Sequence, residues 1–245
     1  MTAPRKIVVT QPKKLELRRI ERPPKAGVTP KTVRLTRLTP LALRPRAKVV
    51  AGRLPAFFSK RYKLLEAVGK GGMSVVYKAF DNMLNMTVAI KFLPERLLRD
   101  RNAADRFKHE AGIAMRLSHE HIVKLHNLET ERNRMFLVME YVEGRDVRET
   151  LRQIGPFPLV PMLQTAYSCA TALDYAHERN VLHMDIKPEN LMLTRDSVLK
   201  IIDFGTARRI EQSLAGDGEF IEGSPPYMSP EQILGYPLDH RTDVY

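Results

Sequence analysis

Residues with catalytic character are concentrated in one short stretch, VLHMDIKPENLML, from Val181 to Leu193. Asp185 could accept the proton of an attacking hydroxyl, or orient that hydroxyl. Lys187 could neutralise negative charge that develops on a transferred group. Asn190 supplies a hard oxygen of the kind that Mg²⁺ takes beside phosphate oxygens. The stretch therefore has the residue types that phosphoryl transfer requires.

Two further features could bind a phosphate chain and its metal. VGKGGMSVVYKAF, from Val68 to Phe80, places Gly69, Gly71 and Gly72 between two strand-like runs. Glycine lets the backbone approach a phosphate and turn its N–H groups toward it, although glycines are also common in ordinary hairpins. Downstream, Asp203 in IIDFGTA offers a second oxygen ligand for Mg²⁺. Together these features are compatible with a bound nucleotide.

Lys91, in the run VAIK, lies on a predicted strand between apolar neighbours. A buried ammonium needs an anionic partner. Glu110 lies on or near the face of the next predicted helix that carries Phe107 and Ala111, so it can reach Lys91. The pair would hold the ammonium ready for phosphate oxygens. Two alternatives stay open: a lysine at a strand edge that keeps its ammonium in water, and a glutamate that faces solvent.

The elements that must position these residues come as strands first and helices later. Short β-rich runs at 62–68, 74–80 and 86–93, separated by glycines or by DNMLN, are typical of an antiparallel meander. We expect next a helix over 100–118, strands at 121–129 and 134–142, helices at 146–154 and 159–179, and strands at 190–194 and 198–203. This order predicts an α+β fold, with a small sheet lobe plus one helix followed by a helical lobe.

The glycine-rich loop, VAIK, the helix glutamate, HMDIKPEN, DFG and SPE, in this order, resemble the signature of eukaryotic-type protein kinases. The sequences of these motifs are most similar to those of bacterial serine/threonine kinases. The resemblance covers residues 61–245 and implies a bilobal protein-kinase-like fold that transfers the γ-phosphate of ATP to Ser or Thr hydroxyls of a protein substrate. We therefore predict a tail over 1–59 and a kinase domain over 60–245, with an N-lobe at 60–143 and a partial C-lobe at 144–245.

The resemblance also implies roles at individual positions. Asp185 would be the catalytic base, and Asn190 and Asp203 would hold Mg²⁺. A lysine at position 187 is typical of serine/threonine rather than tyrosine kinases. Met139 stands at the gatekeeper position, before the hinge. The residues implied to bind ATP are Val68, Gly69, Lys70, Gly71, Gly72, Met73, Ser74, Val75, Val76, Ala89, Lys91, Glu110, Met139, Glu140, Val142 and Met192.

Met184 is the main departure from the family pattern within the catalytic loop. In the family an arginine at this position meets a phosphate on the activation loop, and a thioether cannot do so. The loop itself, at 206–222, has only Thr206 and Ser213 as acceptors. We therefore predict a kinase that is not switched on by phosphorylation of this loop.

The end of the chain, HRTDVY at 240–245, resembles the opening of the long helix that supports the catalytic loop in this family. Asp243 would then be the aspartate that hydrogen-bonds the backbone around HMD. Because the chain stops at Tyr245, we expect the C-terminal lobe to be incomplete in this polypeptide.

The basic character of the chain belongs to its N-terminal segment. Residues 1–59 hold 15 of the 40 Lys+Arg but 2 of the 28 Asp+Glu, a net charge of +13, whereas the remainder has a net charge of −1. Eight of the 17 prolines also lie there, so we expect an extended, mostly disordered tail. Its charge suits an acidic partner or a polyanion, and a solvated linker without a specific partner is the alternative.

Cys169 is the single cysteine, which excludes an intrachain disulfide and favours a reducing compartment, the cytoplasm. In LQTAYSCATALDYA it falls on a predicted helix with apolar or small residues at 163, 166, 170 and 173, which indicates a packed core thiol. The sequence has no apolar run long enough to span a membrane and no signal-peptide pattern at its N-terminus.

Three functions are weighed from these features. An ATP-dependent serine/threonine kinase explains the catalytic residues. A truncated or inactive kinase-like module, which binds nucleotide or a partner without turnover, explains the short C-terminal lobe. A nucleic-acid binder driven by the tail rests on charge alone.

Overall fold

The computed structural model of the chain describes residues 59–70, 75–93, 101–131, 134–204, 208–209 and 224–245. The chain divides into a unit of Met1–Leu35 and a unit of Thr36–Tyr245, and all the described residues lie in the second unit. The predicted tail over 1–59 falls outside the description except for Ser59.

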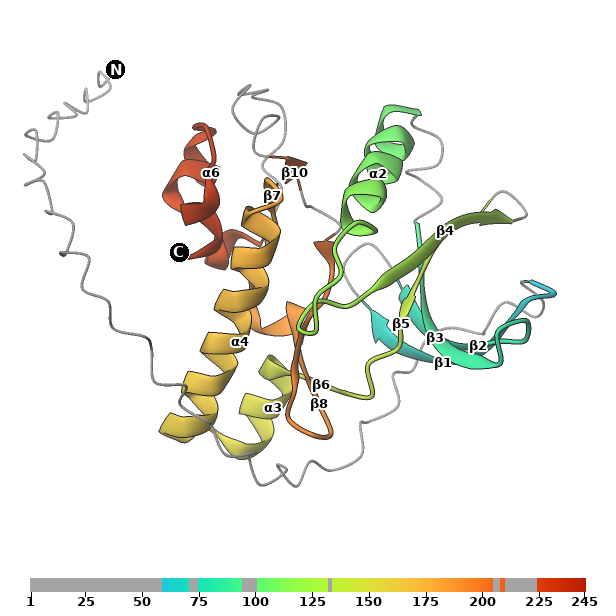
Figure 1. Ribbon diagram of the computed structural model, residues 1–245, viewed down its shortest axis with the longest axis horizontal. Helices are drawn as coiled ribbons and strands as arrows, with labels where there is room; N and C mark the ends of the chain where they lie inside the picture. The colour runs from blue at the N-terminus through green and yellow to red at the C-terminus, as the bar shows by residue number, and fades with distance from the viewer. Residues whose placement is uncertain (1–58, 71–74, 94–100, 132–133, 205–207, 210–223) are drawn as a thin grey trace, which may run out of the picture. The chain divides into compact units, whose positions relative to one another are not determined.

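Five strands form one antiparallel sheet in the order β1-β2-β3-β5-β4 (Figure 1). The strands are β1 (Tyr62–Lys70), β2 (Val75–Asp81), β3 (Met86–Phe92), β4 (Leu125–Glu131) and β5 (Arg134–Glu140). Helix α2 (Arg101–Ala114) lies between β3 and β4 in the chain and packs near β4. The sheet core contains Tyr62, Ala79, Val88, Ile90, Phe136 and Val138, all less than 3% exposed. The predicted meander and helix therefore form one small lobe.

An ion pair between Arg61 and Asp81 lies at one end of this sheet. Asp81, which is 1% exposed, accepts hydrogen bonds from Nε and Nη2 of Arg61 and from the backbone N–H groups of Met83 and Leu84. Burial by itself would raise the pKa of Asp81, but the hydrogen bonds from Arg61 and the two amides outweigh it, so the pKa lies below its ordinary value. The carboxylate thus fixes the turn between β2 and β3.

Asp81→Asn is expected to lower the free energy of unfolding at pH 7 by about 1–3 kcal/mol, because the amide cannot replace the charge that Arg61 contacts. The folded-state pKa of Asp81 is lowered, so this stabilisation is present above the unfolded pKa of about 4 and is lost as the pH falls through the folded value. Urea unfolding of both proteins between about pH 7 and 2 measures the effect. Asp105→Asn, at an exposed pair with Lys108, is the control. A difference that stays constant with pH would contradict the prediction.

The second lobe begins with β6 (Gly144–Asp146), which pairs with β8 (Leu191–Thr194), and β8 pairs with β9 (Leu199–Ile201). Helices α3 (Val147–Ile154) and α4 (Leu159–His177) follow β6. Asp146 caps α3 by accepting a hydrogen bond from Glu149 N at 2.7 Å. The main core of this region joins α4 to β7 (Val181–Leu182), β9 and the end of α2, and includes Ile113, Leu117, Ile122, Ala172, Leu173, Ala176, Val181 and Ile201.

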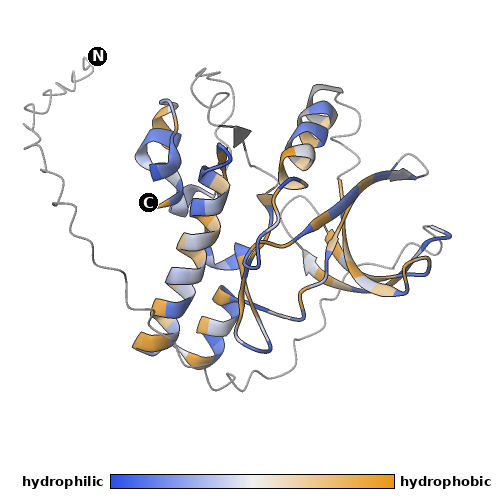
Figure 2. Cartoon of the chain, in the orientation of Figure 1, coloured by the Kyte–Doolittle hydropathy of each residue, from blue (hydrophilic) through white to orange (hydrophobic). Residues whose placement is uncertain are grey.

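The helix predicted over 159–179 is present as α4, but its predicted buried face is wrong in the first half. Leu163 is 54% exposed and Ala166 and Ala170 are exposed as well, so of the predicted face only Leu173 is buried, beside Ala172 and Ala176. The apolar residues at the start of α4 show as orange in Figure 2. Cys169 is partly buried, and burial, with the charge of Asp243 as a smaller cause, raises the pKa of its thiol to about 11. The prediction of an unreactive, packed thiol agrees with this environment.

The strand predicted over 121–129 is wrong in its first four residues, because β4 begins at Leu125. The residues before it, 121–123, pair instead with Ile201 of β9. Ile122 forms a parallel bridge with Ile201, Val123 N donates to Ile201 O at 2.9 Å, and Ile201 N donates to His121 O at 2.7 Å. This connection therefore ties the five-stranded sheet to β9.

From residue 188 on, the described chain also contains short elements, of which only the last, at 240–243, was expected, because HRTDVY resembles the opening of a helix. They are η1 (Pro188–Asn190), β10 (Arg208–Arg209), η3 (Pro225–Tyr227), α6 (Pro230–Leu234) and η4 (His240–Asp243). The order of strands before helices confirms the predicted α+β fold. Within the described residues, none of the helices has the length and apolar character needed to cross a membrane.

Candidate active site

The catalytic loop is the segment between β7 and η1, and a buried histidine anchors it. His183 is 0% exposed, its Nε2 contacts Ile202 O at 3.1 Å, and its ring packs edge-on against Phe204. Asp185 N donates to His183 Nδ1 at 3.2 Å. Both ring nitrogens of His183 thus contact backbone groups, and the histidine holds the loop in place.

The loop brings Asp185, Lys187 and Asn190 together around one carboxylate. Asp185 Oδ2 accepts from Lys187 Nζ and from Asn190 Nδ2, the latter at 3.0 Å. Asn190 Nδ2 also donates to the backbone oxygen of Asp185 at 2.8 Å. Asp185 Oδ1 is buried and has no hydrogen-bond partner among the described residues. Oδ2 is therefore positioned by side chains of the loop, whereas Oδ1 has no partner within the described structure.

Lys187 reaches from the loop to the described segment that begins at Ser224. Its Nζ, besides contacting Asp185, donates to Ser224 Oγ at 2.6 Å. The lysine side chain is 19% exposed. Its ammonium therefore lies between the Asp185 carboxylate and the Ser224 hydroxyl.

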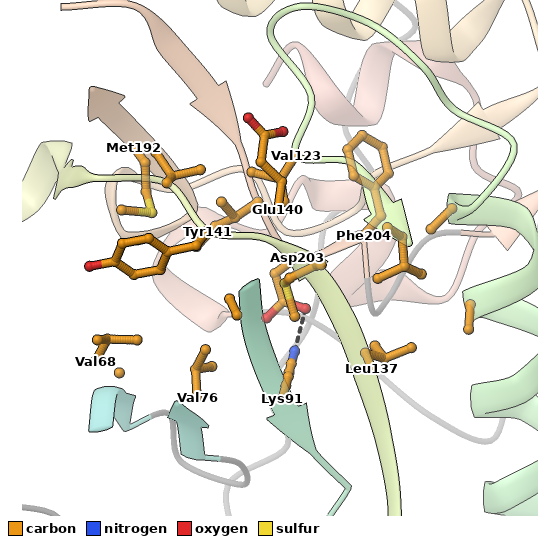
Figure 3. Close-up of a pocket in the computed structure, with 18 of the residues that line it drawn as sticks. Val68, Val76, Lys91, Val123, Leu137, Glu140, Tyr141, Met192, Asp203 and Phe204 are labelled. Carbon is orange, nitrogen blue, oxygen red and sulfur yellow. Dashed lines mark hydrogen bonds and ion pairs between the residues drawn. The ribbon is translucent and has the colours of Figure 1, made fainter. Parts of the chain in front are cut away.

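A pocket lies between β1, β2 and β3 on one side and the hinge (residues 140–144), β8 and residues 202–204, which follow β9, on the other (Figure 3). Of the residues predicted to bind ATP or metal, it is lined by Val68, Gly69, Val76, Ala89, Lys91, Met139, Glu140, Val142, Met192 and Asp203. The strand register explains this grouping, because Val76 lies opposite Lys91 and Ala89 lies opposite Met139 across neighbouring strands. Residues distant in sequence thus meet at one apolar surface.

Some predicted residues do not line this pocket or cannot be placed. Val75 begins β2 and is not among the lining residues. The side chain of Lys70 and residues 71–74 lie outside the described part of the chain. The side chain of Glu140 contacts Lys200 Nζ at 2.8 Å and Lys124 N at 3.2 Å, so its carboxylate is engaged by residues outside the pocket lining.

Lys91 forms an ion pair with Asp203, drawn as the dashed line in Figure 3. The expected partner, Glu110, lies on α2, but its side chain is outside the described residues, so that ion pair stays a prediction. Lys91 is 16% exposed and Asp203 38% exposed. The structure thus joins the cation predicted to bind phosphate to the carboxylate predicted to bind metal.

The pocket wall also contains residues that sequence reasoning did not assign to a site. These are Phe107, Ala111, Ala114, Val123, Leu125, Leu137, Tyr141, Ile202 and Phe204. Most are apolar, and three of them lie on α2, so in the sequence they carry the same pattern as core residues. The signal that could have found them is their position next to predicted site residues, such as Tyr141 after Glu140 and Phe204 after Asp203.

Comparison with known proteins agrees with the fold. The protein kinase domain family matches residues 62–245, so the chain belongs to the protein kinase family. A protein of Clostridium acetobutylicum named "Probable serine/threonine-protein kinase" is 38% identical over 187 residues, which is 76% of this chain and 28% of the relative. The serine/threonine-protein kinase PknB of Mycobacterium leprae is 36% identical over 196 residues, 78% of this chain and 32% of the relative.

A third relative, the serine/threonine-protein kinase PksC of Streptomyces coelicolor, is 38% identical over 205 residues, 80% of this chain and 36% of the relative. The chain therefore spans about a third of the length of these relatives. These matches confirm the predicted resemblance to the serine/threonine protein kinases of bacteria.

Proposed function

We propose that this chain carries the catalytic machinery of an ATP-dependent serine/threonine protein kinase. The observation that carries the proposal is how the two carboxylate oxygens of Asp185 are hydrogen-bonded. Its Oδ2 is occupied by Lys187 and Asn190, while its Oδ1 is buried and lacks a partner within the described structure. A buried acceptor of this kind needs a donor, and a substrate hydroxyl that is about to be deprotonated is such a donor.

The pocket fits a nucleotide in shape and in chemistry. Ala89, Val76 and Met192 supply apolar surface for a flat base, and the backbone of the hinge lies beside them. Lys91 supplies a positive charge at the far end of the same pocket. ATP, when bound, provides the phosphoryl group that is transferred.

Asn190 and Asp203 are the residues that would hold Mg²⁺. In the described residues there is no cluster of three or more His, Cys, Asp or Glu side chains that could bind a metal unaided. This fits Mg²⁺, which typically takes one or two protein ligands and completes its shell with phosphate oxygens and water. The ion would neutralise phosphate charge, and Asp203, now paired with Lys91, would exchange that partner for the metal.

The chemical roles of the protein groups follow from this arrangement. Asp185 Oδ1 orients the acceptor hydroxyl and takes its proton. Lys187, held between Asp185 and Ser224, stabilises negative charge on the moving phosphoryl group. Met184 is buried and packs with Leu182 and Leu238. Its side chain is uncharged, so it cannot form an ion pair with a phosphate. The activation loop lies outside the described residues, and its independence from phosphorylation stays a prediction.

Asp185→Asn in residues 1–245 is expected to lower Mg²⁺-dependent phosphate transfer from ATP to a Ser- or Thr-containing protein by about 10²–10⁴-fold, the contribution of a positioned general base. A radiometric assay with Asp185→Asn and Asp185→Ala measures it. Asp196→Asn, an exposed aspartate in the β8–β9 turn, is the matched control and should keep wild-type activity. Nucleotide binding without transfer by the wild-type chain would instead support the inactive kinase-like module.

Two finer statements belong to this proposal. A cytoplasmic location is proposed from the single cysteine, Cys169, which needs no oxidising compartment. An acidic partner for residues 1–59 is proposed from their charge, and its binding should weaken steeply with added salt.

A further inference from the structure

The residue before the proposed base has a strained backbone. Met184 has a φ of 66°, in the left-handed region that side chains with a Cβ rarely adopt. It is 8% exposed. Such a conformation persists where the surrounding structure holds it. What holds Met184 therefore sets the direction in which the chain enters Asp185.

Both backbone polar groups of Met184 are bound by side chains from the last described segment. Asp243 Oδ1 accepts a hydrogen bond from Met184 N at 2.7 Å. Gln232 Nε2 donates to Met184 O at 2.9 Å. The Met184 side chain packs with Leu182 and Leu238. Residues 229–243 thus hold both the backbone and the side chain of Met184.

Gln232 is itself fixed in one orientation. It is 6% exposed on α6, and its Oε1 accepts a hydrogen bond from Ser229 N at 3.0 Å. Its backbone N donates to Ser229 Oγ at 3.3 Å. Because the amide oxygen is taken by Ser229, the amide nitrogen must face Met184 O. The capping interaction at the start of α6 therefore also orients the donor that reaches the catalytic loop.

We propose that Gln232 is a positioning residue for the base Asp185. The carbonyl of Met184 and the N–H of Asp185 belong to the same rigid peptide plane. Gln232 holds the oxygen of this plane, and His183 Nδ1 accepts its N–H at 3.2 Å. Fixing both ends fixes the plane from which the Asp185 side chain extends. The catalytic part of this inference rests on the proposed kinase function.

Gln232→Glu tests the inference with little change in shape. The carboxylate keeps an acceptor for Ser229 N but, when ionised, cannot donate to Met184 O. We expect faster amide hydrogen exchange in residues 183–187 and a kcat lowered about tenfold, as for one lost hydrogen bond in the loop, with an unchanged KM for ATP. Gln232→Met, which also lacks the donor but adds no charge, should give the same pattern.

Gln153→Glu, on the exposed surface of α3, is the matched control and should leave both readouts at wild-type values. The assays use the whole chain, after thermal unfolding has shown that each variant is folded. Wild-type exchange and wild-type kcat in both Gln232 variants would overturn the inference, as would equal losses in kcat and in ATP affinity. If the wild-type chain transfers no phosphate, the proposed function fails, but hydrogen exchange still decides whether Gln232 holds the loop.

Discussion

Replacing Lys91 with methionine is expected to lower phosphate transfer by about 10²–10³-fold, the usual effect of removing one group that stabilises transition-state charge. Methionine has a similar length and suits the apolar wall on which Lys91 lies, so the strand should keep its structure. The ammonium that now pairs with Asp203 is lost, and phosphate oxygens lose their cation in the pocket. Nucleotide affinity should fall less than kcat, because apolar side chains of the pocket, and not Lys91, hold the adenine ring of ATP.

The same substitution at Lys63 is the control for Lys91→Met. Lys63 is exposed on β1 of the same sheet and lies opposite Phe80, away from the pocket lining. Transfer kinetics and equilibrium nucleotide binding measured on both variants separate chemistry from affinity. A Lys91→Met protein with a wild-type kcat would remove Lys91 from the proposed mechanism.

The catalytic loop could be predicted from sequence because its contacts are local. Asp185, Lys187 and Asn190 lie within six consecutive positions, so almost any compact turn brings them together. The fold class followed from the order of strand and helix patterns in the same way. Local patterns also explain the error at 121–129, since the apolar alternation continues through a connection that pairs with β9.

The contacts of Lys91 could not be predicted from local patterns, because they depend on how distant elements pack. Asp203 is 112 residues further along the chain, and no spacing rule selects it over Glu110. Gln232 is a similar case. The structure shows Gln232 in a capping box with Ser229, a local contact, but its second contact, with Met184 O, requires the tertiary fold. The sequence therefore indicated which chemistry is present, and packing decided which groups meet.

Asp243→Asn is expected to destabilise the described domain by about 2–4 kcal/mol, because three donors converge on this one buried carboxylate. Asp243 accepts hydrogen bonds from His183 N at 2.8 Å, from Met184 N at 2.7 Å and from His177 Nε2 at 2.8 Å. Burial by itself would raise the pKa of Asp243, but the hydrogen bond from His177 and the two amides outweigh it and hold the pKa below its ordinary value. An asparagine would turn its NH₂ toward at least one of these donors.

Thermal unfolding at pH 7 measures this loss, which corresponds to a decrease in Tm of about 5–15 °C for a domain of this size. Asp239→Asn is the matched control, because Asp239 lies four residues earlier and forms an exposed pair with Arg241. Exposed pairs contribute about 1 kcal/mol or less, so this variant should unfold near the wild-type temperature. Equal stability of the two variants would mean that Asp243 does not anchor the catalytic loop. A large decrease confined to Asp243→Asn, together with faster exchange of the amides of His183 and Met184, would show that the strained loop backbone depends on this carboxylate.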